Sequence, residues 1–136
     1  MSDPVETVRS FHDAFAARDA DRIAALFHPE IEWTAAENFI YADQSPYRGV
    51  DGVLHLLFGR VLSDWDVFST RADEILGGGD IVIASGRFRG IYKANRARVD
   101  AQIVEVFQFK DGRIAKVQTY TDTAQFKEAV SRVQAA

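Results

Sequence analysis

Glu105 is the residue of this 136-residue chain whose surroundings in the sequence are best suited to chemistry. It lies in the segment DAQIVEVFQFKDGRIAKVQTYTD (residues 100–122), where two β-rich runs flank an Asp-Gly dipeptide at residues 111–112 that is typical of two-residue hairpin loops. A carboxyl group among apolar side chains either finds a hydrogen-bond partner or keeps its proton. Glu105 is therefore our first candidate for a general acid or base. The structural alternative is an ion pair across the sheet with Arg87 or Arg89.

The register of this hairpin decides which residues share the face of Glu105. With a two-residue loop, Lys110 pairs with Arg113, and Glu105 then lies opposite Gln118. A three-residue loop with a bulge at Gly112 moves the register by one and mixes large and small residues on both faces. We favour the first register because it separates large from small side chains. The Glu105 face then carries Ile103, Phe107, Phe109, Ile114 and Tyr120, with Asp122 farther along, and the other face carries Val104, Val106, Ala115 and Val117.

Asp122 and Tyr120 complete the predicted catalytic set. Asp122 is a second acid on the Glu105 face, although the run Asp-Thr-Ala-Gln at residues 122–125 also has the spacing of a helix cap, and the two roles are compatible. Tyr120 and Gln118 can orient a carbonyl or hydroxyl group. The predicted ligand-binding residues are Trp33, Glu37, Tyr47, Phe58, Tyr92, Ile103, Phe107 and Gln118. For most of the aromatic residues among them, a place in the core is the alternative.

The sequence predicts neither a metal site nor a cofactor. There is no cysteine, and His12, His28 and His55 fall on separate predicted helices without the spacing of a His-x-His or His-Glu-x-x-His motif. The Gly-Gly-Gly run at residues 77–79 precedes a strand, which indicates a hairpin turn and not a phosphate-binding loop. No serine occupies a Gly-x-Ser-x-Gly motif.

The composition indicates a single domain over residues 1–136. Hydrophobic residues make up 47% and charged residues 26%, as in ordinary soluble globular proteins. No apolar run reaches membrane-spanning length and the first residues, MSDPVETVRS, are acidic and polar, so we expect a cytoplasmic protein without a signal peptide. The net charge is −4 and the basic residues form no consecutive block, so we expect neither nucleic-acid nor membrane binding.

The remaining elements can be read from local patterns. Residues 3–6 (Asp-Pro-Val-Glu) combine a capping acid, a proline at the first helical position and a glutamate three residues after the cap, which predicts a helix start. We then expect a second helix, which has Phe27 on its apolar face and ends at His28-Pro29, a strand over 30–36 and a loop over 38–47. A third helix is expected to be capped by Asp51 and to end near Trp65, followed by strands over 67–76 and 81–92 and by the hairpin. The final helix is expected to bury Phe126, Ala129, Val130 and Val133. This order predicts an α+β fold in which N-terminal helices pack on a curved, mainly antiparallel sheet, followed by a C-terminal helix.

The order of elements and several strings resemble the nuclear transport factor 2-like superfamily, in its SnoaL-like, ketosteroid isomerase-related branch. The strings are FHDAFAARDADRIAALFHPEIEW, YRGVDGVLHLLFGRV, GRFRGIYK and VEVFQFKDGRIAKVQTYTD, and the resemblance covers residues 5–130. It implies a cone of helices wrapped on a strongly bent sheet around a hydrophobic pocket. It also implies a homodimer through the outer face of the sheet, to which Val104, Val106, Val117 and Thr119 would contribute.

The resemblance places individual residues at known positions of the family. Glu105 is similar in position to the protonated acid of the ketosteroid isomerase oxyanion hole. The isomerase tyrosine on the first helix corresponds to Phe11, and its proton-shuttling aspartate to Ala35. Asp122 falls where limonene epoxide hydrolases and polyketide cyclases keep a catalytic acid. The Arg-x-Asp of the hydrolase corresponds to Arg-Phe-Arg at residues 87–89, so neither known set of catalytic residues is complete.

These observations predict a protein with a small-molecule pocket. The expected function is that of a cofactor-independent enzyme of isomerase, hydrolase or cyclase type, which acts by acid–base chemistry on a small, largely apolar substrate. The alternative is a non-catalytic ligand-binding or dimerisation domain. The expected partners are a small-molecule ligand and a second copy of the chain.

Overall fold

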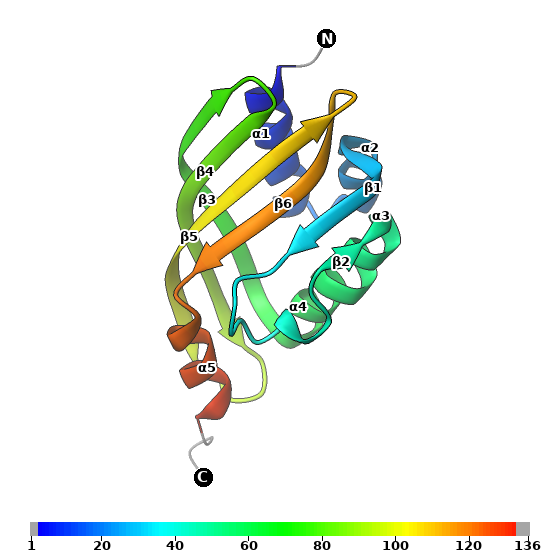
Figure 1. Ribbon diagram of the computed structural model, residues 1–136. Helices are drawn as coiled ribbons and strands as arrows, with labels where there is room; N and C mark the ends of the chain where they lie inside the picture. The colour runs from blue at the N-terminus through cyan, green and yellow to red at the C-terminus, as the bar shows by residue number, and fades with distance from the viewer. Residues whose placement is uncertain (1–2, 133–136) are drawn as a thin grey trace.

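The computed structural model describes residues 3–132 and has an α+β fold (Figure 1). The helices are α1 (Pro4–Ala16), α2 (Ala20–Leu26), the 3-10 turn η1 (Ala42–Gln44), a continuous helix made of α3 (Gly49–Asp51), the π-helical segment η2 (Gly52–Phe58) and α4 (Gly59–Asp64), and α5 (Thr123–Ser131). The strands are β1 (Phe27–Thr34), β2 (Tyr47–Arg48), β3 (Trp65–Gly78), β4 (Ile81–Tyr92), β5 (Arg98–Lys110) and β6 (Arg113–Thr121). Within the described range, no helix is both long and apolar enough to cross a bilayer. The predicted fold class is confirmed.

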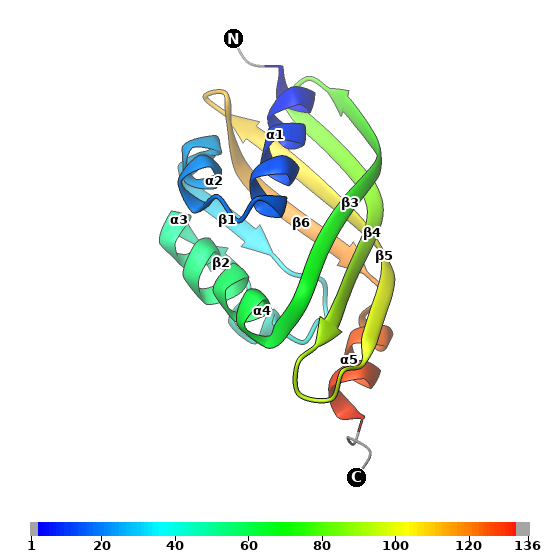
Figure 2. The ribbon, with the colours of Figure 1, turned by 180° about the vertical axis from the view of Figure 1, so that it is seen from behind.

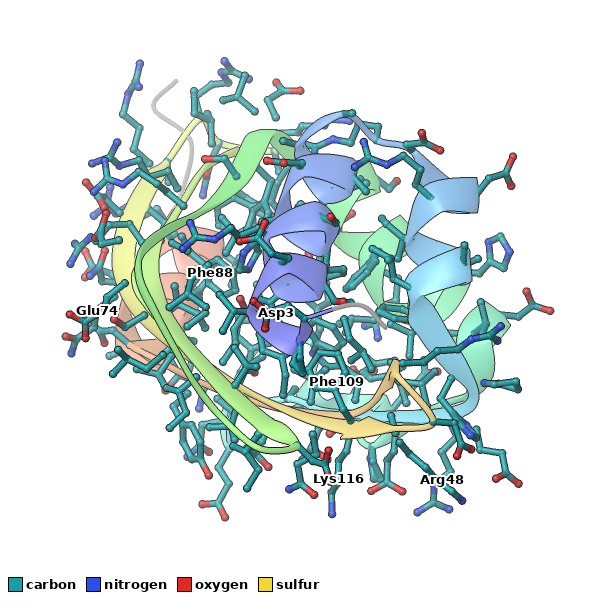
Figure 3. The ribbon with its side chains drawn as sticks, turned by 90° about the horizontal axis from the view of Figure 1, so that it is seen from above. Asp3, Arg48, Glu74, Phe88, Phe109 and Lys116 are labelled. Carbon is teal, nitrogen blue, oxygen red and sulfur yellow. The ribbon has the colours of Figure 1, made fainter. Side chains whose placement is uncertain are left out.

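A single curved sheet organises the chain. Its six strands lie in the order β2-β1-β6-β5-β4-β3, and all neighbours are antiparallel except β1 and β6, which are parallel. The sheet bends around α1, with Phe88 pointing towards the helices and Glu74 and Lys116 pointing away (Figure 3). Helices α1, α2 and α3–α4 cover this concave face, and α5 lies at one end of the sheet (Figures 1 and 2).

Helix α1 begins as the sequence predicts. The backbone N–H of Val5 donates to the carboxylate of Asp3 at 3.2 Å, and Pro4 occupies the first turn, where its missing N–H has no cost. The buried side chains of α1 are Thr7, Val8, Phe11, Ala14 and Phe15. Their three- and four-residue spacing turns one stripe of the helix towards the sheet.

Three predictions about the N-terminal half are wrong. Phe27 begins β1 instead of extending the second helix, because its buried ring pairs with Ile114 of β6 across the sheet. The segment 38–47, predicted as a loop, contains η1 and ends in β2, where Tyr47 pairs with Trp33. The third helix also begins earlier, at Gly49.

Tyr41 explains how this segment keeps an ordered path. Its hydroxyl donates to Asp64 at 2.7 Å and accepts from the indole N–H of Trp65 at 3.0 Å. Burial, together with the neighbouring Asp64 carboxylate, raises the pKa of the Tyr41 phenol. The phenol is therefore a neutral donor that links the segment to the start of β3.

The hairpin has the predicted two-residue loop but a different register beyond it. Lys110 pairs with Arg113 as expected. One extra residue, Ala115, is then inserted in β6, because Phe109 pairs with Ile114 and the preceding Gln108 pairs with Lys116. Such a bulge moves all later pairs by one residue. Glu105 consequently lies opposite Thr119 and not Gln118.

The bulge also reverses the faces of four residues. Val117 and Thr119 point into the core, with 0% and 6% of their surface exposed, so the prediction that they contribute to an outer dimer surface is wrong. Gln118 and Tyr120 lie on the opposite face, and Tyr120 is 57% exposed. The prediction that these two share the face of Glu105 is therefore also wrong. The final predicted core residue, Val133, lies outside the described residues.

Gly86 allows the close approach of β3 and β4 where the sheet bends. It pairs with Ala72, next to a second register shift between Ala72 and Glu74. A Cβ atom at position 86 would lie 1.7 Å from the carbonyl oxygen of Arg71. Only a residue without a side chain fits there.

We expect Gly86→Ala to lower the free energy of unfolding by about 3 kcal/mol, because rotation of a side chain cannot relieve a clash with a backbone carbonyl. Gly78→Ala, in the same pair of strands, is the matched control, since its new Cβ would meet no atom within 4 Å. It should cost less than about 1 kcal/mol. Urea unfolding followed by tryptophan fluorescence measures both values. Equal losses for the two variants would contradict the close approach.

Candidate functional site

The concave face of the sheet and the helices enclose a partly open cavity. The centres of water molecules can occupy a volume of about 50 Å³ in this cavity, which is room for more than one water. Seven aromatic rings line it, from Phe11, Phe15, Trp33, Phe39, Phe58, Phe68 and Phe88. The polar side chains of the lining are His12, Thr70, Glu105, Thr119 and Thr121. The cavity is thus an apolar chamber with a few polar groups, the usual character of a small-molecule site.

Glu105 and His12 are the two ionisable side chains among the described residues that line the cavity, and they contact each other. The alternation of β5 turns Glu105 towards the helices, and α1 turns His12 towards the sheet. Their side chains are 4% and 10% exposed, and Nε2 of His12 lies 2.8 Å from Oε1 of Glu105. The prediction that Glu105 lies on an apolar inner face is borne out by its burial.

The hydrogen bond between His12 and Glu105 determines which atoms of the two side chains remain available to a ligand. When Glu105 is ionised, its carboxylate can only accept, so Nε2 of His12 then carries the shared proton. Nδ1 of His12 is buried and has no hydrogen-bond partner among residues 3–132. Oε2 of Glu105 is the carboxylate oxygen that His12 does not engage, and it is available to a ligand in the cavity. In the described part of the chain, no group of three or more Asp, Glu or His side chains is placed to hold a metal ion.

His12 was missed as a site residue by reasoning from the sequence. His12, His28 and His55 lack the spacing of a metal site, but a histidine that pairs with an acid needs no such spacing. A signal was nevertheless present, because His12 lies four residues after Val8 and three before Phe15. That spacing puts it on the inner stripe of α1, where an ionisable group needs a partner.

Four predicted ligand-binding residues lie on the inner side of the fold. Trp33 and Phe58 line the cavity, with their rings edge to face at a centroid distance of 5.1 Å. Ile103 and Phe107 are buried on the same face of β5 as Glu105, but they belong to the core and do not line the cavity.

Three other predicted residues are outside the cavity lining. The hydroxyl of Tyr47 donates to the backbone carbonyl of Tyr41 at 2.5 Å, which makes Tyr47 part of the loop packing. Tyr92 packs on Trp65 at a centroid distance of 5.1 Å. Glu37 is exposed in the segment after β1. None of the three lines the cavity.

Asp122 is separated from Glu105 in this structure. It is the residue before α5, it accepts a hydrogen bond from the side chain of Gln125 at 3.0 Å, and its carboxylate makes no hydrogen bond to the helix backbone. Thr121 lines the cavity but Asp122 does not. Together with the outward Tyr120, this means that the predicted catalytic set is not assembled around one point.

Arg87 and Arg89 do not pair with Glu105, so the structural alternative proposed for this acid is wrong. Their Nε atoms lie 2.9 and 3.2 Å from the carboxylate of Asp100 on the outer face of the sheet. Hydrogen bonds from Arg87 and Arg89 hold the pKa of Asp100 below its usual value. The two arginines therefore form a surface cluster with Asp100, away from the cavity.

Comparison with known proteins identifies several similar chains. The SnoaL-like domain matches residues 8–117. An NTF2-like protein from Burkholderia thailandensis has 27% identity and a TM-score of 0.91, over 97% of this chain and 100% of that one. A proposed SnoaL-like polyketide cyclase from a Jannaschia species has 20% identity and a TM-score of 0.80, over 96% and 92% of the two chains. IdmH, a proposed polyketide cyclase from Streptomyces antibioticus, has 16% identity and a TM-score of 0.79, over 96% and 100%.

The two proposed cyclases share the fold of this chain, and at these identities the likeness extends to the fold alone. A search of curated proteins gives no match. Phe11 and Ala35, which the family resemblance places at the positions of the isomerase tyrosine and aspartate, both line the cavity as apolar residues.

We expect the His12–Glu105 pair to behave as a coupled unit in a double-mutant cycle. Glu105→Leu and His12→Leu should each lower the free energy of unfolding by about 3 kcal/mol, because each leaves the other group buried without a partner. The double variant should be more stable than either single one, since apolar side chains then fill the space together. Chemical denaturation at neutral pH measures all four proteins.

The exposed ion pair of Arg96 with Asp66, 2.6 Å apart, is the control for this cycle. Asp66→Leu should cost less than about 1 kcal/mol, because water replaces the lost partner. If the two losses at His12 and Glu105 simply add in the double variant, the pair is not a coupled buried unit.

Proposed function

The chain belongs to the SnoaL-like domain family of the nuclear transport factor 2-like superfamily, and from this premise we propose that it is an acid–base enzyme for a small, neutral, largely apolar molecule. The proposed reaction is of isomerase or cyclase type and consists of proton transfer at a carbon atom. Glu105 transfers the proton and His12 is its partner. No cofactor is needed for such a step.

The observation that carries this proposal is the 2.8 Å hydrogen bond between His12 and Glu105 in the wall of an aromatic cavity. The imidazole donates to Oε1 and so fixes the orientation of the carboxylate. Oε2 then points its lone pairs at the substrate as a positioned base.

The lining of the cavity supports a neutral substrate. Among the described residues that line the cavity there is no arginine or lysine, so a bound carboxylate or phosphate would meet Glu105 without the charge of such a side chain to compensate. The aromatic rings favour a flat or cyclic hydrocarbon skeleton through apolar contact and ring stacking. Because these rings exclude water from the cavity, they would also strengthen the electrostatic effect of His12 and Glu105 on the substrate.

Binding without turnover is the second candidate function. It is supported by the position of Asp122, since the cavity then has one acid where the predicted mechanism used two. In that case Glu105 and His12 would orient a ligand and transfer no proton.

We expect the protein to accelerate the exchange of carbon-bound protons for deuterium in cyclohexanone or 2-tetralone dissolved in D2O, measured by proton NMR. Glu105→Gln should lower the rate by about 100-fold or more, because the amide cannot accept the proton. Glu37→Gln, at an exposed acid outside the cavity, is the matched control and should retain the wild-type rate. Wild-type exchange by Glu105→Gln would remove this residue from the mechanism. Saturable ligand binding without any acceleration would favour the binding function.

We also propose that two copies of the chain form a homodimer through the outer face of the sheet. Leu76, Ile83 and Val106 lie side by side on β3, β4 and β5, and Leu76 and Ile83 are 58% and 41% exposed. A row of exposed apolar side chains across a sheet is typical of a surface that another copy covers.

We expect Ile83→Lys to convert the dimer to a monomer, because a charge at the centre of an apolar contact loses its water without gaining a partner. Sedimentation velocity measures the change. Leu56→Lys is the control, since Leu56 is a similarly exposed residue (50%) on the helix α3–α4. A monomeric wild-type protein, or a dimeric Ile83→Lys variant, would contradict this contact.

A further inference from the structure

Thr119 lies beside Glu105 on the inner face of the sheet. The two residues are directly opposite each other in the β5–β6 pairing, so their Cβ atoms are about 5 Å apart. Thr119 is 6% exposed and lines the cavity together with Glu105. The bulge at Ala115 is what turns Thr119 inward, and the predicted register would have placed it on the other face.

The hydroxyl of Thr119 has an unused proton. Its oxygen accepts a hydrogen bond from the backbone N–H of Ala36 at 3.2 Å. A hydroxyl group also donates one hydrogen bond, and among residues 3–132 no acceptor takes it. The neighbouring Thr121 differs, because its hydroxyl donates to the carbonyl of Gln102 at 2.6 Å. Thr70 also lines the cavity, but it lies on β3, two strands from Glu105.

The two side chains therefore offer complementary groups to one ligand. Within residues 3–132, Oε2 of Glu105 is an acceptor without a protein partner and Oγ1 of Thr119 is a donor without a protein acceptor. The hydrogen bond from Ala36 holds Oγ1 in place and leaves the proton to turn towards the cavity. A molecule that presents a carbon-bound proton next to an oxygen matches both groups.

We propose that Thr119 is a catalytic residue that donates a hydrogen bond to the carbonyl oxygen of the substrate, which makes the substrate class carbonyl compounds with a proton on the adjacent carbon. This inference rests on the proposed acid–base function of Glu105. In the step, the C–H bond breaks and its proton goes to Oε2 of Glu105. The electron pair of that bond forms a carbon–carbon double bond, and the π pair of the carbonyl moves onto oxygen. The resulting enolate oxygen accepts from Thr119, and Glu105 returns the proton to carbon.

The expected contribution of Thr119 follows from the charge on that oxygen. The hydrogen bond is stronger to an enolate than to a neutral carbonyl, so it acts on kcat more than on KM. Removal of one such donor typically lowers kcat by about 100-fold. If Thr119 had a purely structural role, through the hydrogen bond from Ala36, its substitution would change the stability of the protein and would leave kcat relative to KM unchanged.

Three variants separate these roles in the ketone exchange assay. Thr119→Val removes the hydroxyl at nearly constant volume and should lower kcat by about 100-fold with KM changed less than about 3-fold. Thr119→Ser keeps the donor and should recover most of the lost rate. Thr7→Val is the matched control, because Thr7 is also 6% exposed and its hydroxyl donates to the carbonyl of Asp3 at 3.2 Å, outside the cavity.

Binding of phenol and toluene tests the same contact without turnover. The phenol hydroxyl can donate to Glu105 and accept from Thr119, whereas toluene has the same shape and neither ability. By NMR titration, Thr119→Val should weaken phenol about 10-fold and leave toluene unchanged. Equal losses for both ligands, or a wild-type protein that does not prefer phenol to toluene, would overturn the role of Thr119.

The outcomes also distinguish this inference from the proposed function. If Glu105→Gln abolishes exchange while Thr119→Val matches the wild type in kcat and phenol binding, the role of Thr119 is wrong and the acid–base function stands. If phenol binding depends on Thr119 but no ketone exchanges, the catalytic role is overturned together with the proposed function, and the donor contact remains as a feature of a binding site.

Discussion

The hydrogen bond between His12 and Glu105 is the constraint around which the interior is arranged. It joins the first helix to the middle of the sheet through surroundings that are otherwise aromatic and aliphatic. Removal of ionisable groups from water costs several kcal/mol for each charge, and well-packed apolar side chains would avoid that cost. The extensive core, with Phe11 packed against both Trp33 and Phe107, must offset it. A fold that retains a costly pair beside a cavity has the features of a site.

The inserted residue at Ala115 decides which side chains join that pair. The Asp-Gly loop fixes only the first pairs of the hairpin, and both the predicted and the observed strands begin from Lys110 opposite Arg113. Nothing in the local pattern marks Ala115 as unpaired, because the bulge is favoured by tertiary packing: it buries Val117 and leaves Tyr120 in solvent. The alternation of side chains along a strand correctly predicts that Glu105 on β5 faces inward. On β6 the same alternation gives the wrong faces after the bulge.

The fold was predictable in type from the order of elements and from the family resemblance, and the site only in part. Helix α1 and the loop of the hairpin depend on neighbours in sequence, so capping and turn rules predict them. Glu37 and Asp122 lie in connections whose paths depend on contacts with distant residues, and their positions could not be read from spacing. His12 could have been found from its place on the buried stripe of α1. Its partner could not, because the approach of helix and strand is a tertiary event.

The parallel pairing of β1 with β6 has a consequence for how the protein comes into being. Residues 27–34 are synthesised well before residues 113–121, the strand beside which they lie. Contacts between such distant segments form slowly, since a long loop must close before they stabilise anything. The first helices are therefore made before the strand that completes the sheet, and the chamber that holds Glu105 closes only when β6 has paired with β1 and β5.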